Sequence, residues 1–123
     1  MTSAELVERA EGAAARAYAP YSDYFVGASV LTTDGRVFDG VNVENAAYPL
    51  GVCAERSAIV AAATAGVRPG EIAAIGITAS PCGGCRQWLH EWRIPIVAFR
   101  RADGTLAEYA ADELLPDTWD LPE

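Results

Sequence analysis

Four segments of the chain have the pattern of hydrophobic and polar positions that is typical of helices. In residues 3–18, Leu, Val and Ala recur at helical spacing until Pro20, and Ser3 has the side chain of an N-cap. An alanine-rich segment ends at Gly66, and a second cysteine-bearing segment of helical character begins at Pro81. We therefore expect helices at residues 3–18, 53–66, 81–92 and 112–115.

Five further segments have the composition of β-strands: residues 25–33, 36–43, 72–79, 94–100 and 105–109. The first two meet at Asp34-Gly35, a typical hairpin turn. Residues 72–79 are almost all apolar, which is typical of a strand that is buried on both faces. Because helices separate the later strands, we expect an α/β fold, a three-layer α/β/α arrangement around a central mixed five-stranded sheet.

The composition limits the kind of molecule and of partner. The chain has 123 residues, of which 51% are hydrophobic, and this is enough for one domain spanning residues 1–123. Nine Lys and Arg oppose 17 Asp and Glu, so the net charge is −8, which disfavours nucleic-acid binding. No apolar stretch is long enough to cross a membrane, and no signal segment is evident. We expect a soluble, cytoplasmic protein that acts on a small molecule.

Three cysteines, Cys53, Cys82 and Cys85, lie in two short motifs, C-A-E and P-C-G-G-C. An odd number of cysteines fits a reduced metal site better than a set of disulfides. Both motifs precede predicted helices, whose free N–H groups stabilise thiolates. A zinc ion held by only three protein ligands keeps one position open for water. The cysteines therefore predict a catalytic zinc site.

The residues beside these cysteines carry the charges that such a site needs. Glu55 lies two residues after Cys53, where it can hydrogen-bond a water on the metal and move protons. Three thiolates leave a zinc site negatively charged, and Arg56 and Arg86 are the neighbouring cations that could draw charge off the sulfurs. The alternative is that both arginines are ordinary surface residues.

C-A-E-R together with P-C-G-G-C-R-Q resembles the zinc-dependent cytidine deaminases of the small homotetrameric type. The resemblance continues through Y-A-P-Y-S at 18–22, V-G-A at 26–28, N-V-E-N-A-A-Y at 42–48 and E-L-L-P at 113–116. It implies one Zn²⁺ per chain and a hydrolase that converts cytidine and 2'-deoxycytidine to uridine and 2'-deoxyuridine plus ammonia, in pyrimidine salvage. Glu55 would be the residue that moves protons between water, base and ammonia.

The same resemblance implies residues that bind the nucleoside. Asn42 and Glu44 would hold the ribose, and alternation along a strand would point both to one face; from their residue types alone they are equally well ordinary polar residues at a strand end. Tyr24 would stack on the base, where the family usually has Phe. The backbone of Ala54 and the loop around Ser80 and Cys82 would contact the base.

In a homotetramer with shared active sites, Tyr48 and Trp119 would reach the pocket of a neighbouring subunit, although each could instead pack within its own chain. Trp119 stands where the family commonly has Phe, and the loop between Ala79 and Pro81 is short. These departures bear on substrate range.

Three residues offer weaker signals. His90 lies five residues after Cys85, about 140° around a helix, so we expect it on the helix surface rather than at the metal. Trp88 and Trp92 are one helical turn apart and favour a packing stripe over a base-stacking platform.

Other functions remain open from the sequence. A structural zinc module would leave Glu55 merely helical, and a thiol redox protein would use Cys82 and Cys85 alone. A related deaminase that acts on an aminoacyl-nucleoside antibiotic shares the zinc motifs.

Overall fold

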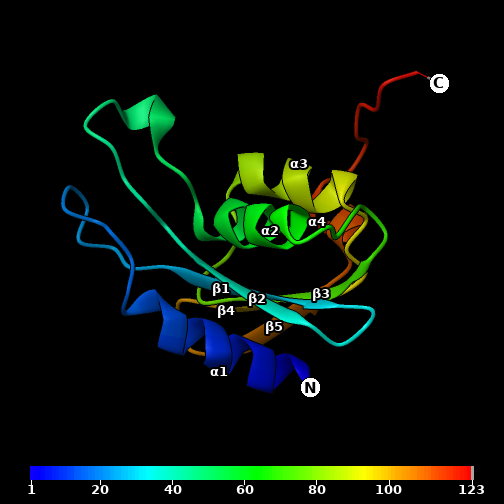
Figure 1. The fold of residues 1–123 in the computed structure, drawn as a ribbon, viewed down its shortest axis with the longest axis horizontal. Helices are drawn as coiled ribbons and strands as arrows, with labels where there is room; N and C mark the ends of the chain where they lie inside the picture. The colour runs from blue at the N-terminus through cyan, green and yellow to red at the C-terminus, as the bar shows by residue number, and fades with distance from the viewer. Residues whose placement is uncertain (123) are drawn as a thin grey trace.

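A mixed five-stranded sheet forms the middle layer of the computed structural model, which describes residues 1–122 (Figure 1). The strand order is β2 (Val37–Val41), β1 (Gly27–Thr32), β3 (Ile72–Ile77), β4 (Val97–Arg100) and β5 (Leu106–Tyr109). Only β3 and β4 are parallel, and the other neighbouring pairs are antiparallel. The predicted sheet is confirmed, with each strand shorter than its apolar segment.

Helices cover both faces of this sheet, as predicted. α1 (Ser3–Ala14) lies on one face, whereas α2 (Ala54–Thr64), α3 (Gly83–Glu91) and α4 (Ala111–Leu114) lie on the other (Figure 1). The expected first helix was too long, because α1 ends at Ala14. Its N-cap is Thr2 rather than Ser3: the Thr2 hydroxyl accepts a hydrogen bond from the Glu5 N–H, and the Glu5 carboxylate accepts one from the Thr2 N–H.

Close contact between helix α2 and strand β2 fixes the start of α2. A side chain on Gly40 of β2 would collide with the backbone of Ala54 and Ala58, so only glycine lets the helix lie this near. Ile59 of α2 is fully buried in the same hydrophobic core as Ile75 and Ile77 of the sheet. The first turn of α2, with its cysteine and carboxylate, is therefore anchored to the sheet.

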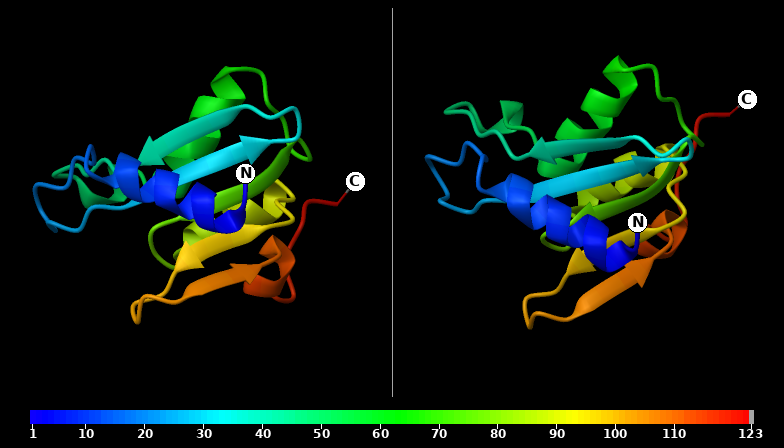
Figure 2. Two further views of the ribbon diagram at one scale, coloured as in Figure 1. Left: turned by 90° about the horizontal axis from the view of Figure 1, so that it is seen from below. Right: turned by 60° about the horizontal axis from the view of Figure 1, so that its bottom comes forward.

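Two loops lie side by side at one end of the sheet. Both views in Figure 2 show the loop that precedes β1 next to the loop that follows β2. Single bridges pair Tyr18 with Val43, and Val43 with Val52, and the second loop contains a short 3₁₀ helix, η1 (Tyr48–Leu50). The loops bring residues 18–26 and 42–53 to the same end of the fold as the start of α2.

Within residues 1–122, the helices are too short or too polar to span a bilayer.

Candidate metal centre and active site

The three cysteine sulfurs meet at the start of two helices. Cys53 is the N-cap residue of α2, Cys82 is the N-cap residue of α3, and Cys85 lies in the first turn of α3. Their Sγ atoms all lie within 4.8 Å of one another, and those of Cys53 and Cys82 are 4.0 Å apart. The Cys85 N–H donates a hydrogen bond of 3.4 Å to the Cys82 sulfur. Two helix N-termini therefore direct positive potential at the cluster.

The three sulfurs can all be ionised only when a cation is bound between them. A hydrogen bond from the Cys85 thiol lowers the pKa of Cys53 to about 6. The same hydrogen bond raises the pKa of Cys85, and burial and the nearby Glu55 carboxylate raise it further. Sulfurs this close cannot all ionise unless a cation neutralises them. Among residues 1–122 this is the one group of three metal-ligating side chains, and it fits one zinc ion per chain.

Arg56 provides a positive charge beside the sulfurs. Burial alone would lower its pKa, but the negative charges that Cys85 and Cys53 carry when ionised, together with a hydrogen bond to Cys85, outweigh this effect and raise the pKa. The guanidinium lies directly against Gly84. Its Nε atom is buried and has no hydrogen-bond partner among the described residues. The structure therefore places Arg56 where it can draw charge off the thiolates.

Arg86 does not serve the sulfurs. Its Nε atom donates to the Pro81 carbonyl at 2.9 Å, Nη1 to the Leu114 carbonyl at 3.1 Å, and Nη2 to the Ser80 hydroxyl at 3.2 Å. The hypothesis that Arg86 neutralises a thiolate is therefore wrong, because its bonds go to other acceptors. It is also no ordinary surface residue, since it is partly buried and ties two segments together.

Glu55 is a buried carboxyl group, with 4% of its surface exposed. Burial raises its pKa, and this effect outweighs hydrogen bonds from its own backbone N–H and from the Cys85 thiol, together with the charge of Arg56. A raised pKa makes a carboxylate a better proton acceptor, and the carboxyl group that forms can return the proton later. Glu55 therefore has the environment of a general acid and base.

A cavity of about 260 Å³ is lined by Cys53 and Cys82, two of the three cysteines, and by Glu55. It brings together most of the residues that the sequence predicted for the site. Its lining consists of Tyr24, Val26, Asn42, Cys53, Ala54, Glu55, Ala79, Ser80 and Cys82. The short loop before Pro81 thus forms one wall of the cavity.

Asn42 and Glu44 lie in the loop that follows β2, and hydrogen bonds to the loop that precedes β1 hold them in place. The Asn42 Oδ1 accepts from the Val26 N–H at 2.8 Å, and its Nδ2 donates to the Tyr24 carbonyl at 2.9 Å. The Glu44 carboxylate accepts hydrogen bonds from the backbone N–H groups of Tyr21 and Ser22 and from the Ser22 hydroxyl. The expectation that strand alternation points both side chains to one face is wrong, because β2 ends at Val41, before either residue.

Glu44 lines a second cavity, of about 330 Å³, together with Tyr21 and Tyr48. Tyr48 is 75% exposed, and its ring meets that of Tyr21 edge to face at 6.0 Å between centroids. Trp119 is 71% exposed. Neither Tyr48 nor Trp119 lines the sulfur-bearing cavity of its own chain.

His90 faces away from the sulfurs, as expected, but it is not a free surface side chain. Its Nδ1 lies 2.9 Å from an Asp112 carboxylate oxygen, and its Nε2 lies 2.8 Å from one of Asp120. Both carboxylates raise the pKa of His90. No local pattern of residues indicates this contact, because the partners lie 22 and 30 residues further along the chain.

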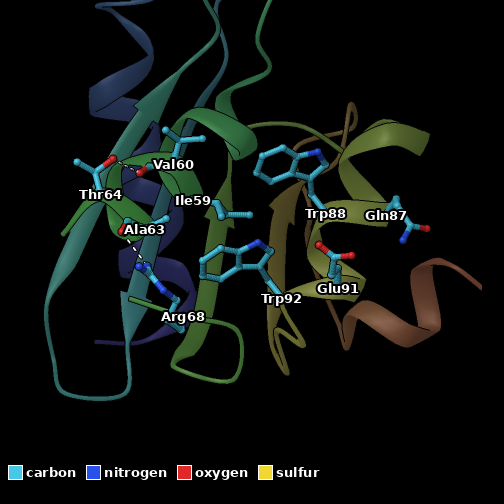
Figure 3. Close-up of a pocket in the computed structure, with 9 residues that line it drawn as sticks. All are labelled: Ile59, Val60, Ala63, Thr64, Arg68, Gln87, Trp88, Glu91 and Trp92. Carbon is cyan, nitrogen blue, oxygen red and sulfur yellow. Dashed lines mark hydrogen bonds between the residues drawn. The ribbon is translucent and has the colours of Figure 1, made fainter. Parts of the chain in front are cut away.

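Trp88 and Trp92 pack against the hydrophobic core, as predicted. They point from α3 toward Ile59 and Val60 of α2, across a groove of about 500 Å³ (Figure 3). This groove is larger than the cavity at the sulfurs, but none of the cysteines lines it. The metal centre therefore belongs to the smaller cavity.

Comparison with known proteins agrees with this geometry. Residues 1–100 match the family model described as the cytidine and deoxycytidylate deaminase zinc-binding region. A cytidine deaminase of Halalkalibacterium halodurans is 40% identical over 120 residues, which cover 90% of this chain and 89% of the relative. One from Sporosarcina psychrophila is 36% identical over 121 residues, which cover 91% and 87% of the two chains.

A solved structure extends the agreement to the fold. The crystal structure of cytidine deaminase from Burkholderia pseudomallei superposes with a TM-score of 0.90 at 45% identity, covering 97% of this chain and all of that one. The match in sequence and in fold, together with the three-sulfur cluster and the buried carboxyl group, shows that the chain belongs to the cytidine and deoxycytidylate deaminase family.

Proposed function

We propose that this protein hydrolyses cytidine and 2'-deoxycytidine to uridine and 2'-deoxyuridine, with release of ammonia. The observation that carries the proposal is the buried Glu55 carboxyl group in the same cavity as two cysteines of the three-sulfur cluster. A structural zinc site needs no such acid, and a dithiol redox site needs neither Glu55 nor the third sulfur.

Cys53, Cys82 and Cys85 would hold the zinc ion, which when bound would act as a Lewis acid and make a water molecule nucleophilic. Glu55 takes a proton from the attacking water and delivers it to N3 of the base. It then transfers the water's second proton to the amino group at C4, so that the C–N bond breaks and ammonia leaves. Burial supports both steps, because it raises the pKa of Glu55.

The remaining cavity residues position the nucleoside. Tyr24 offers an aromatic face for the pyrimidine, and Ala54 offers the backbone at the first turn of α2. Asn42 and Glu44 recognise the sugar. Their hydrogen bonds to the loop that precedes β1 fix their side chains before substrate arrives, which limits the entropy lost on binding.

The chain forms a single catalytic domain that assembles as a homotetramer with shared active sites. Large hydrophobic side chains are exposed together on the two loops beside the cavity, and such patches mark interaction sites. They are Tyr18, Tyr21, Tyr24, Phe25, Val43, Tyr48, Leu50 and Val52. Tyr48 and Trp119 are exposed enough to reach a neighbouring subunit's pocket. The reaction serves pyrimidine salvage in the cytoplasm.

The direct test supplies the zinc-loaded protein with cytidine, 2'-deoxycytidine, cytosine and cytidine monophosphate, and measures ammonia and the change in absorbance. The two nucleosides should be deaminated, whereas the base lacks the sugar and the nucleotide brings a phosphate toward the Glu44 carboxylate. Light scattering at working concentration tests the assembly. If none of the four compounds yields ammonia, the proposed reaction is refuted.

A further inference from the structure

Arg86 connects the wall of the cavity to the C-terminal part of the fold. The three hydrogen bonds of its guanidinium reach the Ser80 hydroxyl, the Pro81 carbonyl and the Leu114 carbonyl, which lies 28 residues away in the sequence. Ser80 lines the cavity, and Pro81 directly precedes Cys82. The arginine thus sits behind the wall against which a substrate must lie.

The hydrogen bond from Arg86 determines what the Ser80 hydroxyl can do. A serine hydroxyl has one hydrogen to donate and two lone pairs. The Arg86 Nη2 group uses one lone pair, so the hydrogen stays available for another acceptor. A charged donor on the oxygen also polarises the O–H bond and makes it a stronger donor. Among the described residues, the Ser80 hydroxyl donates to no acceptor.

We propose that Arg86 is a positioning residue that orients the Ser80 hydroxyl as a hydrogen-bond donor to an acceptor atom of the bound pyrimidine ring. This inference rests on the proposed deamination. The planar guanidinium holds three acceptors in one fixed geometry, which the single ammonium group of lysine cannot reproduce. Ser80 and Arg86 therefore act as one unit in substrate recognition.

The test is a double-mutant cycle with Ser80→Ala and Arg86→Lys, both loaded with zinc. It measures the Kd of the product uridine by calorimetry, the KM and kcat for cytidine, and the zinc content. Ser80→Ala should raise the Kd and KM by roughly two- to tenfold, the usual range for one lost hydrogen bond, with zinc content unchanged. Arg86→Lys alone should raise the Kd and the KM by a similar factor. In the Ser80→Ala background it should change them little further.

A matched control is Arg68→Lys, because Arg68 also donates to two backbone carbonyls, those of Ala63 and Val67, but does not line the cavity at the sulfurs. It should leave the Kd and KM unchanged. Ser80→Thr, which retains a hydroxyl, should recover part of the lost affinity.

Two results would overturn this inference and leave the proposed function standing. In the first, the wild type deaminates cytidine but Ser80→Ala binds uridine as tightly as the wild type does. In the second, the effects of Ser80→Ala and Arg86→Lys on the binding free energy are additive. If the wild type neither binds uridine nor releases ammonia from cytidine, the proposed function fails, and this inference fails with it.

Discussion

Gly84 lies directly against the guanidinium of Arg56, with no room between them for a side chain. Gly84 is part of the loop and helix start that carry Cys82 and Cys85, and Arg56 follows Glu55 on α2. The absence of a side chain at position 84 thus allows a cation to approach the sulfurs.

This contact predicts different effects for two neighbouring substitutions. Gly84→Ala should displace the flexible end of Arg56 and weaken zinc binding, by about tenfold if Arg56 acts as a typical residue behind the metal ligands. Gly83→Ala is the matched control, because a side chain there meets nothing within 4 Å. Competition with a zinc-sensitive chelator measures both affinities. Equal zinc affinity in the two variants would contradict the proposal that Arg56 strengthens zinc binding.

Cys53→Ala should lose the zinc ion, since only two sulfurs of the cluster remain. Metal analysis after dialysis should fall from one zinc per chain to well below one. Because the ion would join the starts of α2 and α3, its loss should also lower the Tm. For scale, a ligand present at 1,000 times its Kd stabilises the folded state by about 4 kcal/mol. The control is wild-type protein stripped of metal. A variant that retains one zinc per chain would contradict the assigned ligands.

Asn42→Ala and Glu44→Ala should raise the KM for cytidine by at least about tenfold if they bind the sugar as proposed. The zinc content should stay at one per chain, because Asn42 and Glu44 line two neighbouring cavities and neither belongs to the three-sulfur cluster. Steady-state kinetics with parallel metal analysis measure both quantities. If free cytosine were turned over as well as cytidine by the wild type, the sugar would not be recognised and this assignment would fail.

His90 should make the stability of the protein depend on pH. The Asp120 and Asp112 carboxylates raise its pKa in the folded state above the ordinary value of 6.5. The protonated histidine is therefore favoured by folding, and its stabilising effect is complete below that value and is lost as the pH rises through the higher folded-state pKa.

Denaturant unfolding at pH 6 and at pH 9 should therefore show a larger loss of unfolding free energy from His90→Gln at pH 6. Asp120→Asn should produce a smaller change with the same pH trend. Equal losses for His90→Gln at the two pH values would show that its protonation does not contribute to stability.

Much of the fold follows from local patterns in the sequence. The helical spacing of Leu6, Val7 and Ala10 predicts α1, and the Asp34-Gly35 turn predicts the hairpin of β1 and β2. The two cysteine motifs predict a metal cluster because short spacings and helix starts leave few arrangements of the sulfurs. These features depend on residues that are near one another along the chain.

The contacts that the sequence did not predict join distant residues. The Arg86 bond to Leu114 and the His90 bonds to Asp112 and Asp120 span 22 to 30 residues, and no local sequence pattern indicates them. The hydrogen bonds of Asn42 depend in the same way on how the two loops fold against each other. Residue type and spacing identify the chemistry at the sulfurs, but the surrounding hydrogen bonds follow from tertiary packing.

The central claim is that Glu55 moves the protons of a zinc-dependent deamination. The most direct measurement compares ammonia release from cytidine by wild-type protein and by Glu55→Gln at equal zinc content. The amide cannot accept or return a proton, so the variant should keep one zinc per chain and lose most turnover, roughly 100-fold or more. Deamination at a near-normal rate by the zinc-loaded variant would contradict the account.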